Sequence, residues 1–163
     1  MATTVVSEHD VTKPIIVRKV LSARNDAGMR TEVSTAEFGG FAMDEPTAHG
    51  GTGTAPSPLQ VVLGALCGCE SVTFNRAAAE MGFRYSGIDF AAAFTIDIRG
   101  RKGVRGIRPH FQTVKLEATV KTDESEARLR AVVEETEARC PVFNLLQDAN
   151  VRLETLWIRK ASQ

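Results

Sequence analysis

The segment from residue 58 to residue 82 constrains the fold more than any other part of the sequence, because apolar or small residues occupy nearly every face of a helix drawn through it. Seven apolar residues leave almost no polar side in its first turns: Leu59, Val62, Leu63, Leu66, Cys69, Val72 and Phe74. Such a helix has to be buried nearly all round. With Ser57 as N-cap, Pro58 in the first turn and Gly82 as the stop, the sequence predicts one long central helix.

The sequence before this helix predicts a β-hairpin. Residues 15–21 and 30–38 have strand-like composition, and the Asn, Asp and Gly residues at 25–28 between them are typical of a tight turn. The segment 39–58 is rich in Gly, Pro and Thr. We expect this segment to form an ordered loop that leads into the helix.

The sequence after the helix predicts three strands and two helices. Apolar residues alternate with smaller or polar ones in 88–98, 112–120 and 151–158, which indicates half-buried strands. From Thr122 the pattern becomes helical, with Asp123 and Glu126 matching a capping box. Pro141 disfavours helical geometry at Cys140 and suits the first position of a helix, which predicts a second, short helix over 142–148.

The order of these elements predicts an α+β fold. Strand, strand, helix, strand, strand, helix and strand show no regular β-α-β alternation, which favours antiparallel sheets that enclose at least one helix. The 163 residues are expected to form one domain with one substantial core.

Charge and hydropathy exclude several classes of partner. Twenty basic residues balance twenty acidic ones, so no overall field attracts the protein to nucleic acid or to an anionic membrane. The sequence has no run of eighteen apolar residues, and its N-terminus lacks the basic start and apolar stretch of a secretory signal. We therefore expect a cytoplasmic protein that binds neither nucleic acid nor membrane.

The three cysteines have to be considered one by one, because this count in a chain without an export signal does not indicate a disulfide framework. Cys67 and Cys69 would lie about 200° apart on a helix, which excludes a redox pair or a joint metal site. The His and Cys spacings lack the short pairs of a zinc site, so no metal is expected. By position alone, Cys69 is either a small core residue or a reactive thiol.

Cys140 differs from the other two because a helix is predicted to start directly after it. The free N–H groups and the positive dipole end of that helix would lower the pKa of its thiol and make it reactive. The alternative is a cysteine that only packs at the end of a helix.

Two blocks of sequence carry a family resemblance: residues 53–69, GTAPSPLQVVLGALCGC, and residues 138–146, ARCPVFNLL. Together they resemble the OsmC/Ohr family, named for osmotically inducible protein C and organic hydroperoxide resistance protein, and within it an atypical branch. The resemblance implies an intertwined homodimer in which antiparallel sheets wrap two long buried central helices. It also implies an active site at each end of the subunit interface.

The resemblance implies a thiol peroxidase as well. In that role Cys69 attacks an organic hydroperoxide and becomes a sulfenic acid, and Cys140 resolves it as a disulfide. A dithiol reductant, either a lipoylated protein or a small thiol, regenerates the thiols, and no cofactor is needed. The family also uses an early Arg to hold the thiolate, for which Arg24 is our first choice and Arg30 the second.

The sequence departs from the family pattern where the peroxidases carry a Glu that orients this Arg. Leu59 stands at that position and Gln60 beside it, while Glu70 would point about 100° away from Cys69 on the helix. We keep Leu59, Gln60, Arg30 and Pro141 as candidates for lining the pocket or orienting its groups. The missing Glu leaves open an alternative, a noncatalytic OsmC-like homodimer that binds a small apolar ligand.

Overall fold

The computed structural model describes residues 13–162. The chain divides into two compact units, Met1–Pro56 and Ser57–Gln163, which we call the N-terminal unit and the C-terminal unit. Residues 1–12, which contributed to the expectation that no export signal is present, lie outside the described residues. No helix between residues 13 and 162 has the length and apolar character needed to cross a bilayer.

The N-terminal unit contains a three-stranded antiparallel sheet in the order β1-β2-β3. Its strands are β1 (Ser22–Asn25), β2 (Thr31–Thr35) and β3 (Gly39–Met43). The turn of the predicted hairpin is confirmed, although its first strand is not the one predicted, and Asn25 closes the turn by donating from Nδ2 to the carbonyl oxygens of Gly28 and Arg30, at 2.8 Å each. An Asn at this position stabilises the turn because its side chain replaces backbone hydrogen bonds.

Two predictions for this unit were wrong in detail. Residues 15–21 form no strand, because the ladder to β2 begins only at Ser22, and their apolar side chains are exposed, with Ile16 at 85%. The segment 39–58 is not all loop, since it begins with β3 and contains the short 3-10 helix η1 (Thr47–His49). Gly39 has a φ of +74°, which lets the chain turn back so that β3 pairs with β2.

The predicted long helix is confirmed as α1 (Pro58–Glu80) in the C-terminal unit. Ser57 and Gln60 form a capping box, in which the Gln60 side chain accepts the Ser57 N–H at 2.9 Å. Within this unit, however, α1 is not buried all round. One face is buried, while Val72 on the other face is 53% exposed. The unit by itself therefore covers only one side of an apolar helix.

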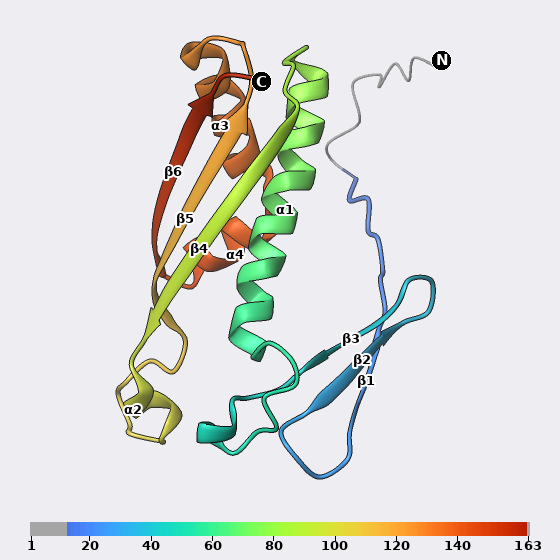
Figure 1. The fold of residues 1–163 in the computed structure, drawn as a ribbon, viewed down its shortest axis with the longest axis vertical. Coiled ribbons are helices and arrows are strands. Elements are labelled where there is room, and N and C mark those ends of the chain that lie inside the picture. Colours follow the sequence, from blue (N-terminus) through green and yellow to red (C-terminus); the bar gives the residue numbers. More distant parts are fainter. Residues whose placement is uncertain (1–12, 163) are drawn as a thin grey trace. The chain divides into compact units, whose positions relative to one another are not determined.

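The C-terminal unit also contains a three-stranded sheet in the order β4-β5-β6 (Figure 1). Its strands are β4 (Gly87–Ile96), β5 (Phe111–Lys121) and β6 (Arg152–Lys160), and the short helix α2 (Ile98–Arg101) lies between the first two. β4 and β5 are antiparallel, as predicted, but β6 runs parallel to β5. The reason is the helical connection between β5 and β6, which returns the chain to the same end of the sheet.

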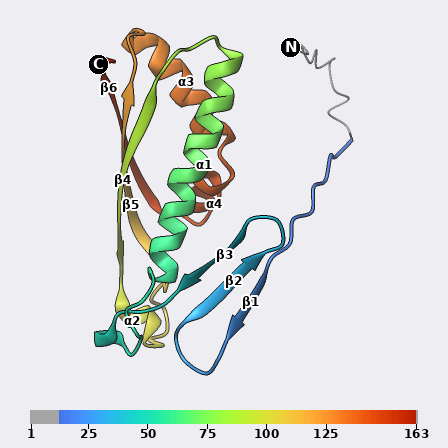
Figure 2. The ribbon, with the colours of Figure 1, turned by 45° about the vertical axis from the view of Figure 1, so that its right-hand side comes forward.

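This connection consists of α3 (Glu126–Arg139) and α4 (Pro141–Asp148). The predicted kink between them is confirmed, because Cys140 has an extended backbone with φ −76° and ψ 113°. The N-cap of α3 is Ser125 and not Asp123, since the Thr122 hydroxyl accepts the Glu124 N–H and prolongs the turn before the helix. Figure 2 shows α1, α3 and α4 on one side of the sheet.

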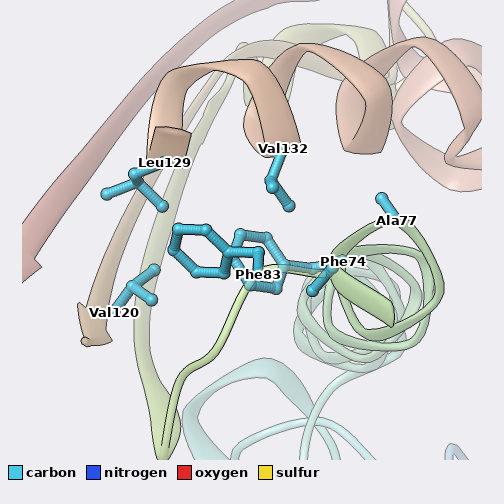
Figure 3. Close-up of a cluster of buried hydrophobic side chains, with 7 residues drawn as sticks. Phe74, Ala77, Phe83, Val120, Leu129 and Val132 are labelled. Carbon is cyan, nitrogen blue, oxygen red and sulfur yellow. The ribbon is translucent and has the colours of Figure 1, made fainter. Parts of the chain in front are cut away.

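The helices are held against the sheet by two clusters of buried apolar side chains. The first surrounds Phe74 (Figure 3). Phe74 also stacks on Trp157, with ring centroids 5.4 Å apart. The second cluster lies farther towards the start of α1 and includes Leu63 and Leu66. Along α1, the turn that carries Cys69 and Glu70 falls between the residues of these clusters. The core therefore has an apolar part on each side of this turn.

Candidate active site

Cys140 joins the two helices of the β5–β6 connection. Its backbone N–H donates to the Thr136 carbonyl oxygen at 2.9 Å, which ends α3, and its Sγ accepts the N–H of Phe143 at 3.5 Å, which begins α4. The side chain is completely shielded from solvent. The predicted position of this thiol at a helix N-terminus is therefore present in the structure.

The Cys140 thiol interacts through its side chain with Cys69 and Glu70, which are consecutive residues of α1. This brings together two thiols that lie far apart in the sequence. All three cysteines of the chain are free thiols.

The environment of Cys140 raises the pKa of its thiol, against our prediction. Burial is the main cause, and side-chain interactions of the protonated thiol with Cys69 and Glu70, together with the negative charge of Glu70, add to it. The N–H of Phe143 acts in the expected direction and lowers the pKa, but by less than burial raises it. The thiol of Cys140 is consequently protonated at neutral pH.

Glu70 is a fully buried carboxyl group in this cluster. Neither carboxylate oxygen makes a hydrogen bond of ordinary geometry with the described residues, although the Cys140 thiol interacts with the group. Burial raises the pKa of Glu70 to about 7, the charge of Glu137 adds to the rise, and the Cys140 thiol opposes it. A buried polar group without a partner is rare and points to a functional constraint.

The other two cysteines are half-buried and lie on different sides of α1. Burial raises the pKa of the Cys67 thiol, and the charge of Glu70 adds to this effect. Cys140 interacts with Cys69 and shows no such interaction with Cys67. That the Cys67 and Cys69 thiols do not act as a pair stays a prediction. Across residues 13–162, no group of three or more His, Cys, Asp or Glu is arranged to hold a metal ion.

Asn144 fixes the angle between α3 and α4. Its Nδ2 donates to the carbonyl oxygens of Glu137 and Cys140, at 2.9 Å in each case. Glu137 is held in turn by Trp157, whose Nε1 donates to its carboxylate at 3.0 Å. These contacts connect the helix junction to β6 and restrict the backbone that carries the Cys140 thiol.

The two arginines predicted to serve the thiolate lie in the N-terminal unit. Arg24, in β1, donates from Nε to Asp26 at 2.8 Å, and both side chains are mostly exposed. Arg30 donates to Glu32 at 2.6 Å and to the Thr54 hydroxyl at 2.7 Å. Each guanidinium therefore has a carboxylate partner within its own unit.

The remaining predicted pocket residues have structural roles in the C-terminal unit. Leu59 packs against the second apolar cluster, and Gln60 caps α1 through its side-chain oxygen. Pro141 is the first residue of α4. That these three residues also line the pocket or orient its groups stays a prediction.

Sequence analysis missed Glu70 as a member of the site. The prediction that it points away from Cys69 considered α1 alone, whereas Cys140 comes from another element and meets both side chains. A signal was available, because Glu70 is the only charged residue between Ser57 and Arg76. A single carboxyl group within an otherwise uncharged helix has to be paired, neutralised or functional.

The fold and the neighbouring Cys69 and Cys140 thiols are those of a two-cysteine α+β protein. Comparisons with known proteins identify its family. The family model of OsmC-like proteins matches residues 51–155, more than half of the chain. The chain therefore belongs to the OsmC-like protein family. No curated protein sequence matches it significantly.

Solved structures give the same fold. An OsmC-like protein from Mycoplasma pneumoniae is 17% identical with a TM-score of 0.75, covering 91% of this chain and 100% of that one. An organic hydroperoxide resistance protein OsmC from Legionella pneumophila is 17% identical with a TM-score of 0.69, covering 89% and 99%. A putative organic hydroperoxide resistance protein from Vibrio cholerae, with captopril in one of its active sites, is 23% identical with a TM-score of 0.67, covering 89% and 95%.

Proposed function

We propose that this protein is a cysteine-based thiol peroxidase that reduces organic hydroperoxides. The observation that carries the proposal is the interaction of the buried Cys140 thiol with Cys69. Membership of the OsmC-like family supports it, as do structural neighbours that are named organic hydroperoxide resistance proteins. In this proposal the 163 residues act as one domain, since the family match crosses the boundary between the two units.

The proposed reaction has three steps. The Cys69 thiolate attacks the O–O bond of the hydroperoxide, becomes a sulfenic acid and releases the alcohol after protonation. The Cys140 sulfur then attacks the Cys69 sulfur, so that an S–S bond forms, the S–O bond breaks and water leaves. An external dithiol finally reduces the disulfide by two exchange steps and is itself oxidised to a disulfide.

The different exposure of the two thiols supports this division of roles. Cys69 is half-buried, so a peroxide can reach it, whereas Cys140 is completely buried and its thiol has a raised pKa. A protonated, inaccessible thiol is a poor nucleophile towards a substrate that arrives from solvent. It is suited to react with a sulfur that is already beside it.

A cation near the Cys69 thiolate would stabilise it and the departing alkoxide. We propose Arg24 for this role and Arg30 as the second choice. Arg24 is the more available of the two, because its partner Asp26 lies in the same exposed turn and its side chain is 80% exposed. Arg30 is more constrained, since Glu32 and Thr54 both accept hydrogen bonds from its guanidinium.

We propose that the protein acts as an intertwined homodimer. The exposed side of α1 is apolar and lined by small residues, with open space beside Gly64 and Gly68 where a second helix can approach. In the N-terminal unit, the extended segment 15–21 exposes apolar side chains and has no paired strand among the described residues. A second copy of the chain would bury both surfaces.

The reductant is proposed to be a dithiol, either on a lipoylated protein or in a small thiol compound. The catalytic cycle needs reduced cysteines, which fits the reducing environment of the cytoplasm. The Vibrio cholerae neighbour binds captopril, a small thiol, in one of its active sites. This supports the proposal that our protein has a similar pocket, which admits a thiol reductant.

One observation favours a second candidate function, a noncatalytic homodimer that binds a small apolar ligand. Leu59, at the position where we expect the family's Glu, packs in the apolar core, and Arg24 and Arg30 pair with carboxylates of their own unit. This alternative predicts no peroxide turnover and thiols of ordinary reactivity.

Consumption of cumene hydroperoxide in the presence of a dithiol distinguishes the two candidates. The wild-type protein should turn over, Cys69→Ser should be inactive, and Cys140→Ser should form a sulfenic acid that dimedone traps. Cys67→Ser is the matched control and should retain activity. Peroxidase activity that survives in Cys69→Ser would contradict the proposed mechanism. An inactive wild-type protein would favour the ligand-binding alternative.

A further inference from the structure

We propose that Glu70 is the base that removes the proton from the Cys140 thiol when this thiol attacks the oxidised Cys69. The assignment rests on the proposed function, and it gives a role to a buried carboxyl group whose oxygens have no hydrogen-bond partner among the described residues. Glu70 would also return that proton to the oxygen that leaves Cys69. It is therefore proposed as a catalytic residue in contact with a reacting thiol.

The resolving step needs a base. Cys140 is completely buried, and burial together with its neighbours raises the pKa of its thiol. The thiolate and not the thiol is the nucleophile in disulfide formation, so the proton has to be transferred before or during attack. No solvent reaches the Cys140 side chain to accept it.

Glu70 is positioned to accept this proton. Among the described residues, the side chains that interact with the Cys140 thiol are those of Cys69 and Glu70. Both carboxylate oxygens of Glu70 are buried and free of hydrogen bonds, so their lone pairs are available. A base has to lie close to the proton that it removes, and the Glu70 side chain interacts with the Cys140 thiol without a hydrogen bond of ordinary geometry, as catalytic groups often do before substrate is bound.

The groups around Glu70 affect the pKa of its carboxyl group in opposite directions. Glu137 faces it from α3 and raises the pKa of its carboxyl group, while the Cys140 thiol lowers it. On its own helix, Glu70 raises the pKa of Cys67. The resulting pKa of about 7 allows Glu70 both to accept a proton and to release it near neutral pH, which is the condition for efficient acid–base catalysis.

The proton and electron balance of the step is complete within the site. Glu70 takes the proton of Cys140, and the resulting thiolate attacks the sulfur of the Cys69 sulfenic acid. The S–S bond forms as the S–O bond breaks, and the leaving hydroxide takes the proton from Glu70 to give water. Glu70 returns to its carboxylate form, the two sulfurs share the oxidation, and no further reactant is required.

The test compares Glu70→Gln with the wild-type protein in a Cys67→Ser background, so that only two thiols remain. In the first arm, one equivalent of cumene hydroperoxide is added, and sulfenic acid and disulfide are followed by quenched-flow mass spectrometry. Glu70→Gln should form the sulfenic acid at the wild-type rate and the disulfide at least about tenfold more slowly. The rate of disulfide formation should rise through about pH 7 in the wild type, as Glu70 ionises, and only at alkaline pH in Glu70→Gln.

The second arm uses Ellman's reagent and does not depend on peroxidase activity. Cys69 releases a first equivalent of thionitrobenzoate, and attack by Cys140 on the mixed disulfide releases a second, which Cys140→Ser cannot do. Glu70→Gln should slow the second release at least about tenfold, and Glu70→Asp should restore part of the rate. Glu134→Gln, an exposed position on α3, is the matched control and should behave as wild type.

An unchanged second release in Glu70→Gln, with an unchanged pH profile, would overturn the assignment. If the wild-type protein shows both releases with Ellman's reagent but never reacts with peroxide, the proposed peroxidase function fails. In that case the role of Glu70 is still decided by the second arm. The two failures are therefore distinguishable.

Discussion

The Cys140 thiol lies against the Glu70 carboxyl group, and solvent reaches neither side chain. This arrangement destabilises the folded protein, because a carboxylate in an apolar interior loses its hydration. In return it gains only the thiol, which is a weak hydrogen-bond donor. The residues on either side of it along α1 belong to two well-packed apolar clusters. The polar pair is therefore a local exception inside an otherwise conventional core.

The first prediction concerns the effect of Glu70 on stability. The pKa of Glu70 in the folded protein is about 7, above its ordinary value of 4.5, so the folded state binds the proton more tightly than the unfolded state. Stability from this group is complete below pH 4.5 and is lost as the pH rises to about 7. The loss amounts to about 3 kcal/mol.

Glu70→Gln should lack this decline. Urea unfolding at pH 4.5 and pH 8 should show the wild type losing about 3 kcal/mol more than the variant over this range. Other titrating groups contribute equally to both proteins and cancel in the comparison. Parallel pH dependences of the two proteins would contradict a raised pKa at Glu70.

The second prediction tests the homodimer at the exposed face of α1. Val72 is 53% exposed within its own unit, so Val72→Asp leaves the protomer's core intact but puts a charge into the proposed interface. The dimer dissociation constant should rise at least about 100-fold, as measured by analytical ultracentrifugation. Ala127→Asp, on an exposed face of α3, is the control and should stay dimeric. A wild-type protein that sediments as a monomer would remove the proposal.

The third prediction concerns the aromatic centre of the core. Phe74 is completely buried, stacks on Trp157 and makes edge contacts with Phe83 and Tyr85. Phe74→Ala should lower the free energy of unfolding by about 3–5 kcal/mol and change the Trp157 fluorescence. Leu156→Ala, at a position that is 55% exposed, should cost less than about 1 kcal/mol. Equal effects of the two substitutions would contradict this description of the core.

The fourth prediction separates the two candidate arginines. If Arg24 stabilises the Cys69 thiolate and the departing alkoxide, Arg24→Ala should slow sulfenic-acid formation by about 100-fold. Arg30→Ala removes hydrogen bonds to Glu32 and Thr54 and should have a smaller effect. The rates are measured in single turnovers with dimedone trapping. A larger effect at Arg30 would reverse the assignment, and no effect at either residue would show that neither guanidinium serves the Cys69 thiolate.

The sequence predicted the elements whose structure depends on local signals. The ends of α1 follow from Ser57, Gln60 and Pro58, and the kink at Cys140 follows from Pro141. These are short-range steric and hydrogen-bonding effects. The parallel pairing of β6 with β5 was not predictable in this way, because it depends on how the α3–α4 connection crosses the sheet.

The site was predictable only in part. The association of Cys69 with Cys140 followed from the resemblance to a family, whereas the direction of the Cys140 pKa was predicted incorrectly. A helix N-terminus lowers a thiol pKa, but the sequence does not reveal that this thiol is fully buried beside a carboxyl group. Glu70 was missed for a related reason, because its partner comes from another helix.

The most direct test of the account is the oxidation of the reduced protein by one equivalent of cumene hydroperoxide, followed by intact-mass measurement and peptide mapping without reduction. We expect the protein to lose two hydrogens and to yield a single cross-linked peptide pair that joins Cys69 to Cys140. Cys67 should remain a free thiol. Unchanged thiols, or a Cys69 that is oxidised to the sulfinic acid while Cys140 stays reduced, would contradict the account.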